Sequence, residues 1–154
     1  MAAMAMVFGL RCLVVALFMP FSTADKLLNF SGATDQAASI FKPRALAKIV
    51  ILGGMAIELF CSLALITGWH DRLGAAILAG YCVITALLFK QFWAPGDFWS
   101  NPAGKARTAF WDFWKNLALA AAIMLIAVGA DGRGLSAFVA DPLSSTQPYR
   151  GSQP

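Results

Sequence analysis

The chain has 154 residues, of which 59% are hydrophobic and 13% charged, with a formal net charge of +4 and a mean hydropathy of +0.68. A soluble domain carries about 25% charged and about 45–50% apolar residues. This composition excludes a disordered chain, a nucleic-acid-binding arm and a disulfide-stapled secreted module. It also disfavours a water-soluble enzyme, because so small a globule has too little interior for this much apolar surface. The composition therefore predicts a protein embedded in the lipid bilayer.

Four apolar segments approach the roughly 20 residues that a helix needs to cross a bilayer. With their flanking residues they predict helices over about 4–28, 48–69, 73–93 and 113–130. Continuous apolar runs of this length are not typical of the alternating strands of a membrane barrel. The sequence predicts an all-α fold, a transmembrane four-helix bundle that forms one domain over 1–137. Residues 138–154, rich in Pro, Ser and Gln near their end, are predicted to be a disordered tail.

The first apolar segment has a second interpretation, a cleaved secretory signal peptide. Arg11, the apolar run 12–21 and the small residues that follow would place the cleavage before Asp25. The segment lacks a basic start, however, because only apolar residues and one glycine occupy 2–10. We therefore expect the segment to be retained as the first membrane helix.

Basic residues near the spans predict the orientation of the chain. Loops one and three and their flanks hold eight of them: Lys26, Lys42, Arg44, Lys48, Lys90, Lys105, Arg107 and Lys115. The opposite side holds three, namely Arg72, Arg133 and Arg150. Cytoplasmic loops carry the excess of Lys and Arg. This asymmetry predicts that loops one and three lie in the cytoplasm and both termini outside. The expected location is the plasma (inner) membrane of a bacterial cell.

Two of the charged residues in the predicted spans lie away from the span ends, Arg11 in the first and Glu58 in the second. A charge at a helix centre costs about 2.5–3.5 kcal/mol on insertion scales, so each needs a reason to be there. Both fall near the middle of their segments, and we expect them to pair. The pair has two interpretations: an ion pair that fixes how two helices dock, or the lining of a cavity that binds a polar ligand or moves protons.

Nine aromatic residues stand within the 26 positions 89–114, around loop three. The tryptophans among them are Trp93, Trp99, Trp111 and Trp114. Such residues are typical of a membrane interface, so one interpretation is an aromatic belt with an interfacial or re-entrant segment. The other is an aromatic pocket for a quinone ring, whose carbonyl oxygens could accept hydrogen bonds from Lys90, Lys115 or Asn116.

The residues usually found in catalytic and metal sites form no pattern. Cys12, Cys61 and Cys82 lie on three different predicted helices without a CxxC motif, which is typical of small packing residues. His70 is the only histidine, so the sequence predicts no metal site. No motif for an intrinsic cofactor is present, and no catalytic residue can be assigned.

Several short motifs, in order, resemble the DoxX family of small four-helix membrane proteins. They are Leu10-Arg11, Lys26-Leu27, Glu58 followed by 63–68 and Arg72, Phe113-Trp114-Lys115-Asn116-Leu117, and 129–136. Together they cover nearly the whole chain from Gly9 to Ser136. The family is named for a subunit of a thiosulfate:quinone oxidoreductase, so the resemblance implies a quinone-linked redox role.

Three functions are compatible with these features. The first is a quinone-linked subunit or accessory factor of a membrane redox system, with electrons supplied by a partner protein. Its polar core or ligand site would comprise Arg11, Lys26, Glu58, Lys115 and Asn116. The second is a non-catalytic scaffold or assembly subunit that docks a partner protein. The third, a small-solute transporter, needs a homo-oligomer, because four helices without an inverted repeat leave little room for alternating access.

Overall fold

The computed structural model describes residues 2–129 and 131–150, and within them every regular element is a helix. Four helices are long and apolar enough to cross a membrane: Ala2–Leu28, Arg44–Thr67, Asp71–Phe89 and Lys105–Val128. The predicted all-α transmembrane bundle is therefore confirmed.

The first span changes its helical geometry halfway along. It consists of α1 (Ala2–Ala16), a π-helical turn η1 (Leu17–Ser22) and α2 (Thr23–Leu28). Pro20 lies inside the π-helical turn. Proline has no N–H to donate, and its ring clashes with the carbonyl four residues earlier in a regular α-helix. The wider turn accommodates Pro20 and lets the helix continue to Leu28.

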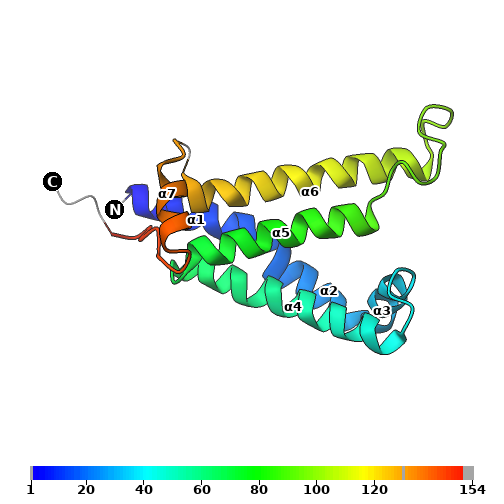
Figure 1. The fold of residues 1–154 in the computed structure, drawn as a ribbon, viewed down its shortest axis with the longest axis horizontal. Helices are drawn as coiled ribbons and strands as arrows, with labels where there is room; N and C mark the ends of the chain where they lie inside the picture. Colours follow the sequence, from blue (N-terminus) through cyan, green and yellow to red (C-terminus); the bar gives the residue numbers. More distant parts are fainter. Residues whose placement is uncertain (1, 130, 151–154) are drawn as a thin grey trace.

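The other spans are α4 (Arg44–Thr67), α5 (Asp71–Phe89) and α6 (Lys105–Val128). The α4–α5 turn is tight because Gly68 adopts a φ of 75° at the end of α4. α5 packs between α4 and α6, and α1 packs against α4. Figure 1 shows α4 and α5 close together near this turn and diverging toward their other ends.

This divergence divides the bundle into two halves. We call the half that holds the start of α1, the α4–α5 turn and the C-terminal segment the tail half, and the other, which holds α3 (Phe30–Ala38) and residues 90–104, the loop half (Figure 1). Both described chain ends therefore lie at one end of the bundle, whereas loops one and three lie at the other.

The apolar core lies mainly in the tail half. Its buried members are Val15, Phe18, Cys61, Leu65, Ala75, Leu78, Ala79, Cys82, Ala120, Ile123 and Ala127. Small residues let the helices approach there: a Cβ on Gly74 would lie 3.0 Å from the Ala64 Cβ. In the loop half the same helices spread apart and leave space between them.

Two predicted loops contain more helix than expected. α3 forms within loop one, because its alanines favour a helix, Ala37 is fully buried and Thr34 bonds back to the Phe30 carbonyl at 2.7 Å. α6 begins at Lys105, eight residues before the predicted start at 113, so the segment 105–112 is helical rather than loop. α5 ends at Phe89, four residues before the predicted end at 93.

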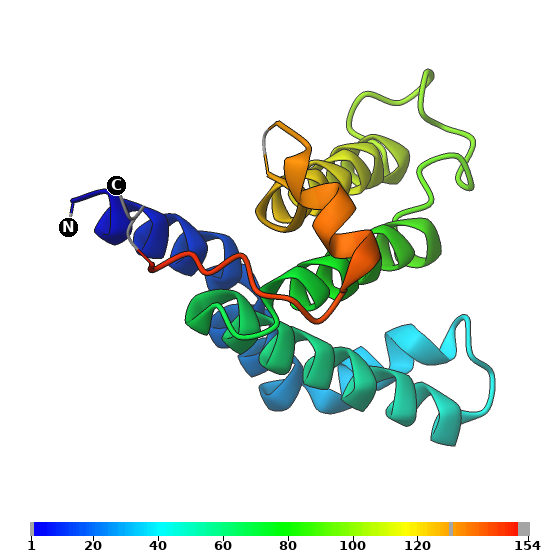
Figure 2. The same ribbon diagram turned by 60° about the vertical axis from the view of Figure 1, so that its left-hand side comes forward.

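The C-terminal segment also differs from the disordered tail predicted over 138–154. α7 (Arg133–Ala140) follows the last span, and residues 141–150 cross over the α4–α5 turn toward the start of α1 (Figure 2). Composition indicated disorder, but hydroxyl groups in this segment bond to the exposed backbone of the turn. Residues 151–154 lie outside the described part of the chain.

Candidate functional site

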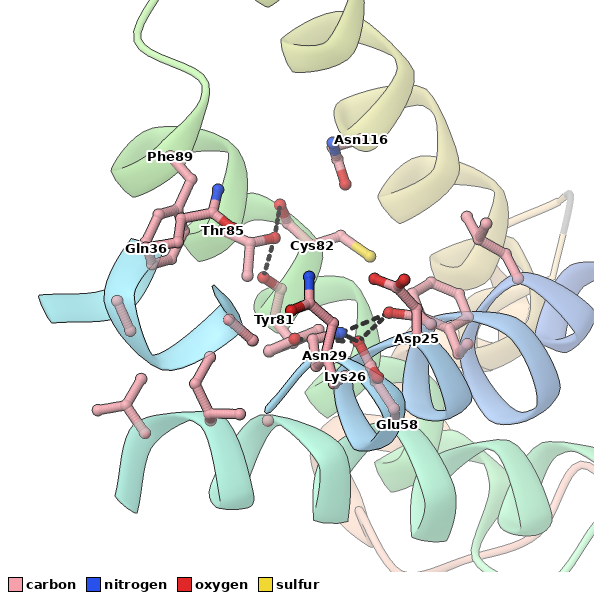
Figure 3. Close-up of a pocket in the computed structure, with 18 of the residues that line it drawn as sticks. Asp25, Lys26, Asn29, Gln36, Glu58, Tyr81, Cys82, Thr85, Phe89 and Asn116 are labelled. Carbon is pink, nitrogen blue, oxygen red and sulfur yellow. Dashed lines mark hydrogen bonds and ion pairs between the residues drawn. The ribbon is translucent and has the colours of Figure 1, made fainter. Parts of the chain in front are cut away.

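A cavity of about 490 Å³ opens in the loop half, where the helices diverge (Figure 3). Side chains from η1, α2, α3, α4, α5 and α6 line it. Its apolar walls include Phe18, Val50, Ile51 and Phe89. Ligand sites are typically cavities of about 300–1,000 Å³ with apolar walls and a few polar groups, and this cavity has that character.

Glu58 forms the polar floor of the cavity and is only 2% exposed. Its Oε1 accepts hydrogen bonds from Lys26 Nζ at 2.7 Å, Ser22 Oγ at 2.9 Å and Tyr81 OH at 3.0 Å. Its Oε2 accepts one from Thr23 Oγ1 at 3.2 Å. The carboxylate is thus neutralised by one lysine and solvated by three hydroxyl groups, which offsets the cost of burying it.

The local sequence explains how these groups converge. The π-helical turn at 17–22 sets the rotation of the first span beyond it. As a result, the side chains of Ser22, Thr23 and Lys26 point toward Glu58 on α4. Gly54 lies one turn before Glu58 on α4, and a Cβ there would lie 3.0 Å from the Tyr81 hydroxyl oxygen. The glycine therefore makes room for the Tyr81 side chain beside the carboxylate.

The cavity lining remains polar from Glu58 toward the loop end. Thr85 lies one turn beyond Tyr81 on α5, and Asn116 faces the cavity from α6 (Figure 3). Lys90 lies near the mouth, where its Nζ donates to Asp112 Oδ2 at 3.1 Å. A second hollow of about 290 Å³ shares Phe89 and Lys90 with the cavity. Polar groups therefore extend from the buried carboxylate to the loop end of the bundle.

The expected pair of Arg11 with Glu58 is wrong. Arg11 Nη1 instead bonds to Asp71 Oδ2 at 2.7 Å and to the Leu65 carbonyl at 2.8 Å. Leu65 is seven residues beyond Glu58 on α4, about 10 Å at 1.5 Å per residue. The first helix extends from Ala2 to Leu28, so position 11 lies in its tail half and not at the depth of Glu58.

The C-terminal segment completes the Arg11–Asp71 cluster. Thr146 donates its backbone N–H to Asp71 Oδ1 at 2.8 Å and its hydroxyl to Oδ2, and accepts from Arg11 Nη2 at 2.9 Å. Ser145 and Tyr149 donate to the carbonyls of Gly68 and Ile66. Burial raises the pKa of the Tyr149 phenol. We call residues 141–150 the strap, since they close the tail end of the bundle.

The aromatic cluster of loop three lies away from the cavity. Phe92 is central, with edge-on contacts to Trp93, Phe110 and Phe113. None of the four tryptophans in 93–114 lines the cavity, and Trp99 is 87% exposed. The interface belt is therefore the interpretation that this geometry favours, whereas the aromatic walls of the cavity come from other residues.

The predicted site residues fall into three groups. Lys26, Glu58 and Asn116 line the cavity together. Arg11 belongs to the cluster with Asp71 in the tail half. The Lys115 side chain is 74% exposed and lies 3.8 Å from Asp112, outside the cavity.

Several residues of these sites were not predicted from the sequence. Tyr81 is a hydroxyl-bearing residue within the third span, and a polar group in a membrane span was a usable signal. Asp71 lies in the short gap between the predicted spans 48–69 and 73–93, where a charge needs no explanation. Ser22 and Thr23 carry no signal on their own, although Pro20 inside an apolar segment indicated irregular geometry nearby.

The cysteines and histidine provide no metal-binding group in the described part of the chain. Cys12, Cys61 and Cys82 are free thiols, of which the latter two are buried. No three His, Cys, Asp or Glu side chains within residues 2–129 and 131–150 are arranged to hold a metal ion. The polar cavity around Glu58 is therefore the candidate functional site.

This fold and site define a small four-helix integral membrane protein with a polar cavity opening toward one end. Residues 6–91, more than half of the chain, match the DoxX family, and the chain belongs to that family. It is also similar to the inner membrane protein YphA of Escherichia coli (strain K12), with 25% identity over 122 residues, covering 79% of this chain and 81% of the relative. No solved structure matches the chain.

Proposed function

We propose that this protein binds a quinone as a subunit or accessory factor of a membrane redox system. The observation that supports the proposal is the cavity beside Glu58, which combines hydrogen-bond donors at its floor with aromatic and aliphatic walls at membrane depth. Quinone head groups are flat rings with two carbonyl acceptors. They need donors at the ring edge and apolar contacts on the ring faces.

The residues of the cavity suit these requirements. Lys26 donates to Ser22 and Glu58 and keeps a third N–H for a ligand near the floor, and the Tyr81 O–H can turn from Glu58 toward a ligand. Asn116 supplies an amide on the opposite wall. Phe18 and Phe89 provide rings for apolar contact. A quinone supplies two-electron, two-proton redox chemistry when bound. The Lys26–Glu58 pair can hold and release a proton beside it, and the electrons would come from a partner redox protein.

The proposed location is the plasma (inner) membrane. It is supported by the four apolar helices and by the relative named as an inner membrane protein. The excess of basic residues at the loop end supports an orientation with that end in the cytoplasm. The cavity would then open toward the cytoplasmic surface.

The test is binding of a short-chain, water-soluble ubiquinone analogue to the purified protein, measured by quenching of tryptophan fluorescence and by thermal shift. Tyr81→Phe removes one donor and should weaken binding by about 5–10-fold, the equivalent of one hydrogen bond of about 1 kcal/mol. Val50→Trp should abolish binding, because the larger side chain fills the cavity from the α4 wall.

Lys115→Gln is the matched control, because it removes a lysine near the loop end that lies outside the cavity. Its affinity should equal that of the unaltered protein. Absence of saturable binding, or equal affinity in Val50→Trp, contradicts the proposal. If partner assembly then persists without quinone binding, the protein is a scaffold.

A further inference from the structure

The path from the Glu58 carboxylate to the loop end of the bundle differs in its lining from the path to the tail end. Toward the loop end, Thr85, Asn116 and Lys90 line the same cavity as Glu58. Lys90 follows the last residue of α5 and lies nine residues beyond Tyr81, so this path is about 13 Å long at 1.5 Å per residue. It reaches Lys90, whose side chain is partly exposed at the mouth.

Toward the tail end, mainly apolar side chains fill the bundle, and the Ser62 hydroxyl, one turn beyond Glu58, is fully buried among them. Cys61, Leu65 and Leu78 lie in that direction, and both leucines are fully buried. Beyond them the Arg11–Asp71 pair and the strap close the end. A close-packed apolar layer does not admit water or ions.

We propose that the Lys26–Glu58 pair is accessible to water, protons and small hydrophilic groups from the loop end only. The titratable groups facing Glu58 are Lys26 from α2 and Tyr81 and Cys82 from α5, and Asp25 also lines the cavity. The cavity residues of α3 and α6, such as Asn116, are uncharged. One-sided access goes beyond the proposed function, because it requires no quinone.

One-sided access has a mechanistic consequence. A carboxylate open to a single face exchanges its proton with that solution and not with the other. With the orientation predicted from the basic residues, protons consumed or released beside Glu58 would come from or return to the cytoplasm. The protein would thereby fix the side of the membrane on which proton exchange occurs.

The test is thiol labelling of the full-length protein in membrane vesicles of both orientations. Its three native cysteines are first replaced (Cys12→Ser, Cys61→Ala, Cys82→Ser). Thr85→Cys and Asn116→Cys are then introduced singly as probes of the path. The reagent is a cationic, membrane-impermeant methanethiosulfonate. Ser100→Cys marks the loop end, and Ser136→Cys marks the tail end.

Ile123→Cys is the matched control, since Ile123 lies two turns beyond Asn116 on the same face of α6, within the fully buried core. Both path probes should react more than about tenfold faster from the side that modifies Ser100→Cys, because a charged reagent does not cross an apolar layer. Ile123→Cys should react from neither side.

Two results would overturn the proposal. One is equal modification of Thr85→Cys from both sides, which means that the tail half is open. The other is no modification of either path probe in vesicles where Ser100→Cys reacts fully, which means that the cavity is closed. A failure of quinone binding with one-sided labelling intact removes the proposed function and leaves one-sided access standing.

Discussion

The tail half and the loop half of the bundle each contain a buried carboxylate paired with a cation, yet their surroundings differ. In the tail half, Asp71 is fully buried, Arg11 is 6% exposed, and the core and the strap enclose both. In the loop half, Glu58 is only 2% exposed but lies against a cavity of about 490 Å³ that extends to the loop end. The comparison teaches that a charged pair in a membrane helix bundle does not reveal its role by itself.

The partners of each pair explain the difference. Arg11 and Asp71 bond to backbone groups and to Thr146, which fixes their positions within one packed unit. Within the part of the chain that the structure describes, the Glu58 carboxylate bonds to side chains alone, among them the flexible Lys26 and the hydroxyl of Tyr81. Side-chain donors can turn toward a ligand, whereas a fully enclosed network cannot exchange its partners without disrupting packing. The first pair is therefore structural and the second is suited to binding.

The largest predicted loss of stability follows from breaking the Arg11–Asp71 pair in the tail half. Asp71→Ala leaves the Arg11 guanidinium buried without its carboxylate, which costs about 3–5 kcal/mol. The free energy of unfolding in detergent micelles, measured by denaturant titration, should fall by that amount. Glu58→Gln should cost less, because Ser22, Thr23 and Tyr81 still bond to the amide and the cavity can admit water.

The double variant Arg11→Met/Asp71→Leu is the control for this prediction. Removing both charges leaves no uncompensated ion, so much of the lost stability should return. If Asp71→Ala and Glu58→Gln destabilise the protein equally, the distinction between the two halves fails.

A smaller effect is expected from truncating apolar side chains in the two halves. Leu78→Ala creates a cavity in the packed tail half and should cost about 2–4 kcal/mol. Ile51→Ala enlarges a space that is already present on the cavity wall, and should cost less than about 1 kcal/mol. Thermal unfolding of the two purified variants measures the difference. Equal losses would show that the loop half packs as tightly as the tail half.

Much of the fold follows from the sequence, because long apolar segments have few alternatives in a bilayer. The four spans and the short α4–α5 turn were predicted in this way. The predicted helix ends were less accurate. α6 starts at Lys105 and not at 113, and contacts of Phe110 with Phe92 and Phe98 stabilise its first turns. These contacts join residues far apart in the sequence, so a local pattern does not reveal them. The strap was not predicted, because composition does not reveal that the Asp71 carboxylate and the carbonyls of Gly68 and Ile66 lie within hydrogen-bond distance of residues 145–149.

The candidate site was only partly predictable. Glu58, Lys26 and Asn116 stood out by charge or by motif, and they do line one cavity. The predicted Arg11–Glu58 pairing was wrong because it placed Arg11 at the middle of the first apolar segment. The first helix continues to Leu28, so its middle lies beyond position 11. Whether two charges meet depends on helix register and rotation, which here follow from the π-helical turn and from packing contacts across the bundle.

A smaller loss of stability is expected when a hydroxyl group of the strap is removed. Thr146→Ala removes the hydroxyl that joins Arg11 to Asp71, while the backbone N–H bond to Asp71 remains. The loss should be about 1–2 kcal/mol, since one hydroxyl bonded to charged groups is removed. Ser144→Ala is the comparison, because the Ser144 hydroxyl accepts a weaker, 3.3 Å bond from Arg72. Denaturant titration of the two variants isolates the contribution of the Thr146 hydroxyl. Similar losses in both variants would mean that the hydroxyl bridge stabilises nothing beyond strap packing.

The smallest predicted effect on stability concerns the outer surface of the loop half. Trp99→Phe should change the free energy of unfolding by less than about 0.5 kcal/mol, because the side chain is largely exposed. In bilayers, however, the indole should lie among the lipid head groups. A variant retaining only Trp99 should be quenched more by lipids brominated near the glycerol than by lipids brominated near the chain ends. Trp69, exposed at the opposite end, provides the matched measurement. Deep quenching of Trp99 would instead indicate a re-entrant segment, and the open end of the cavity would then face lipid rather than the membrane surface.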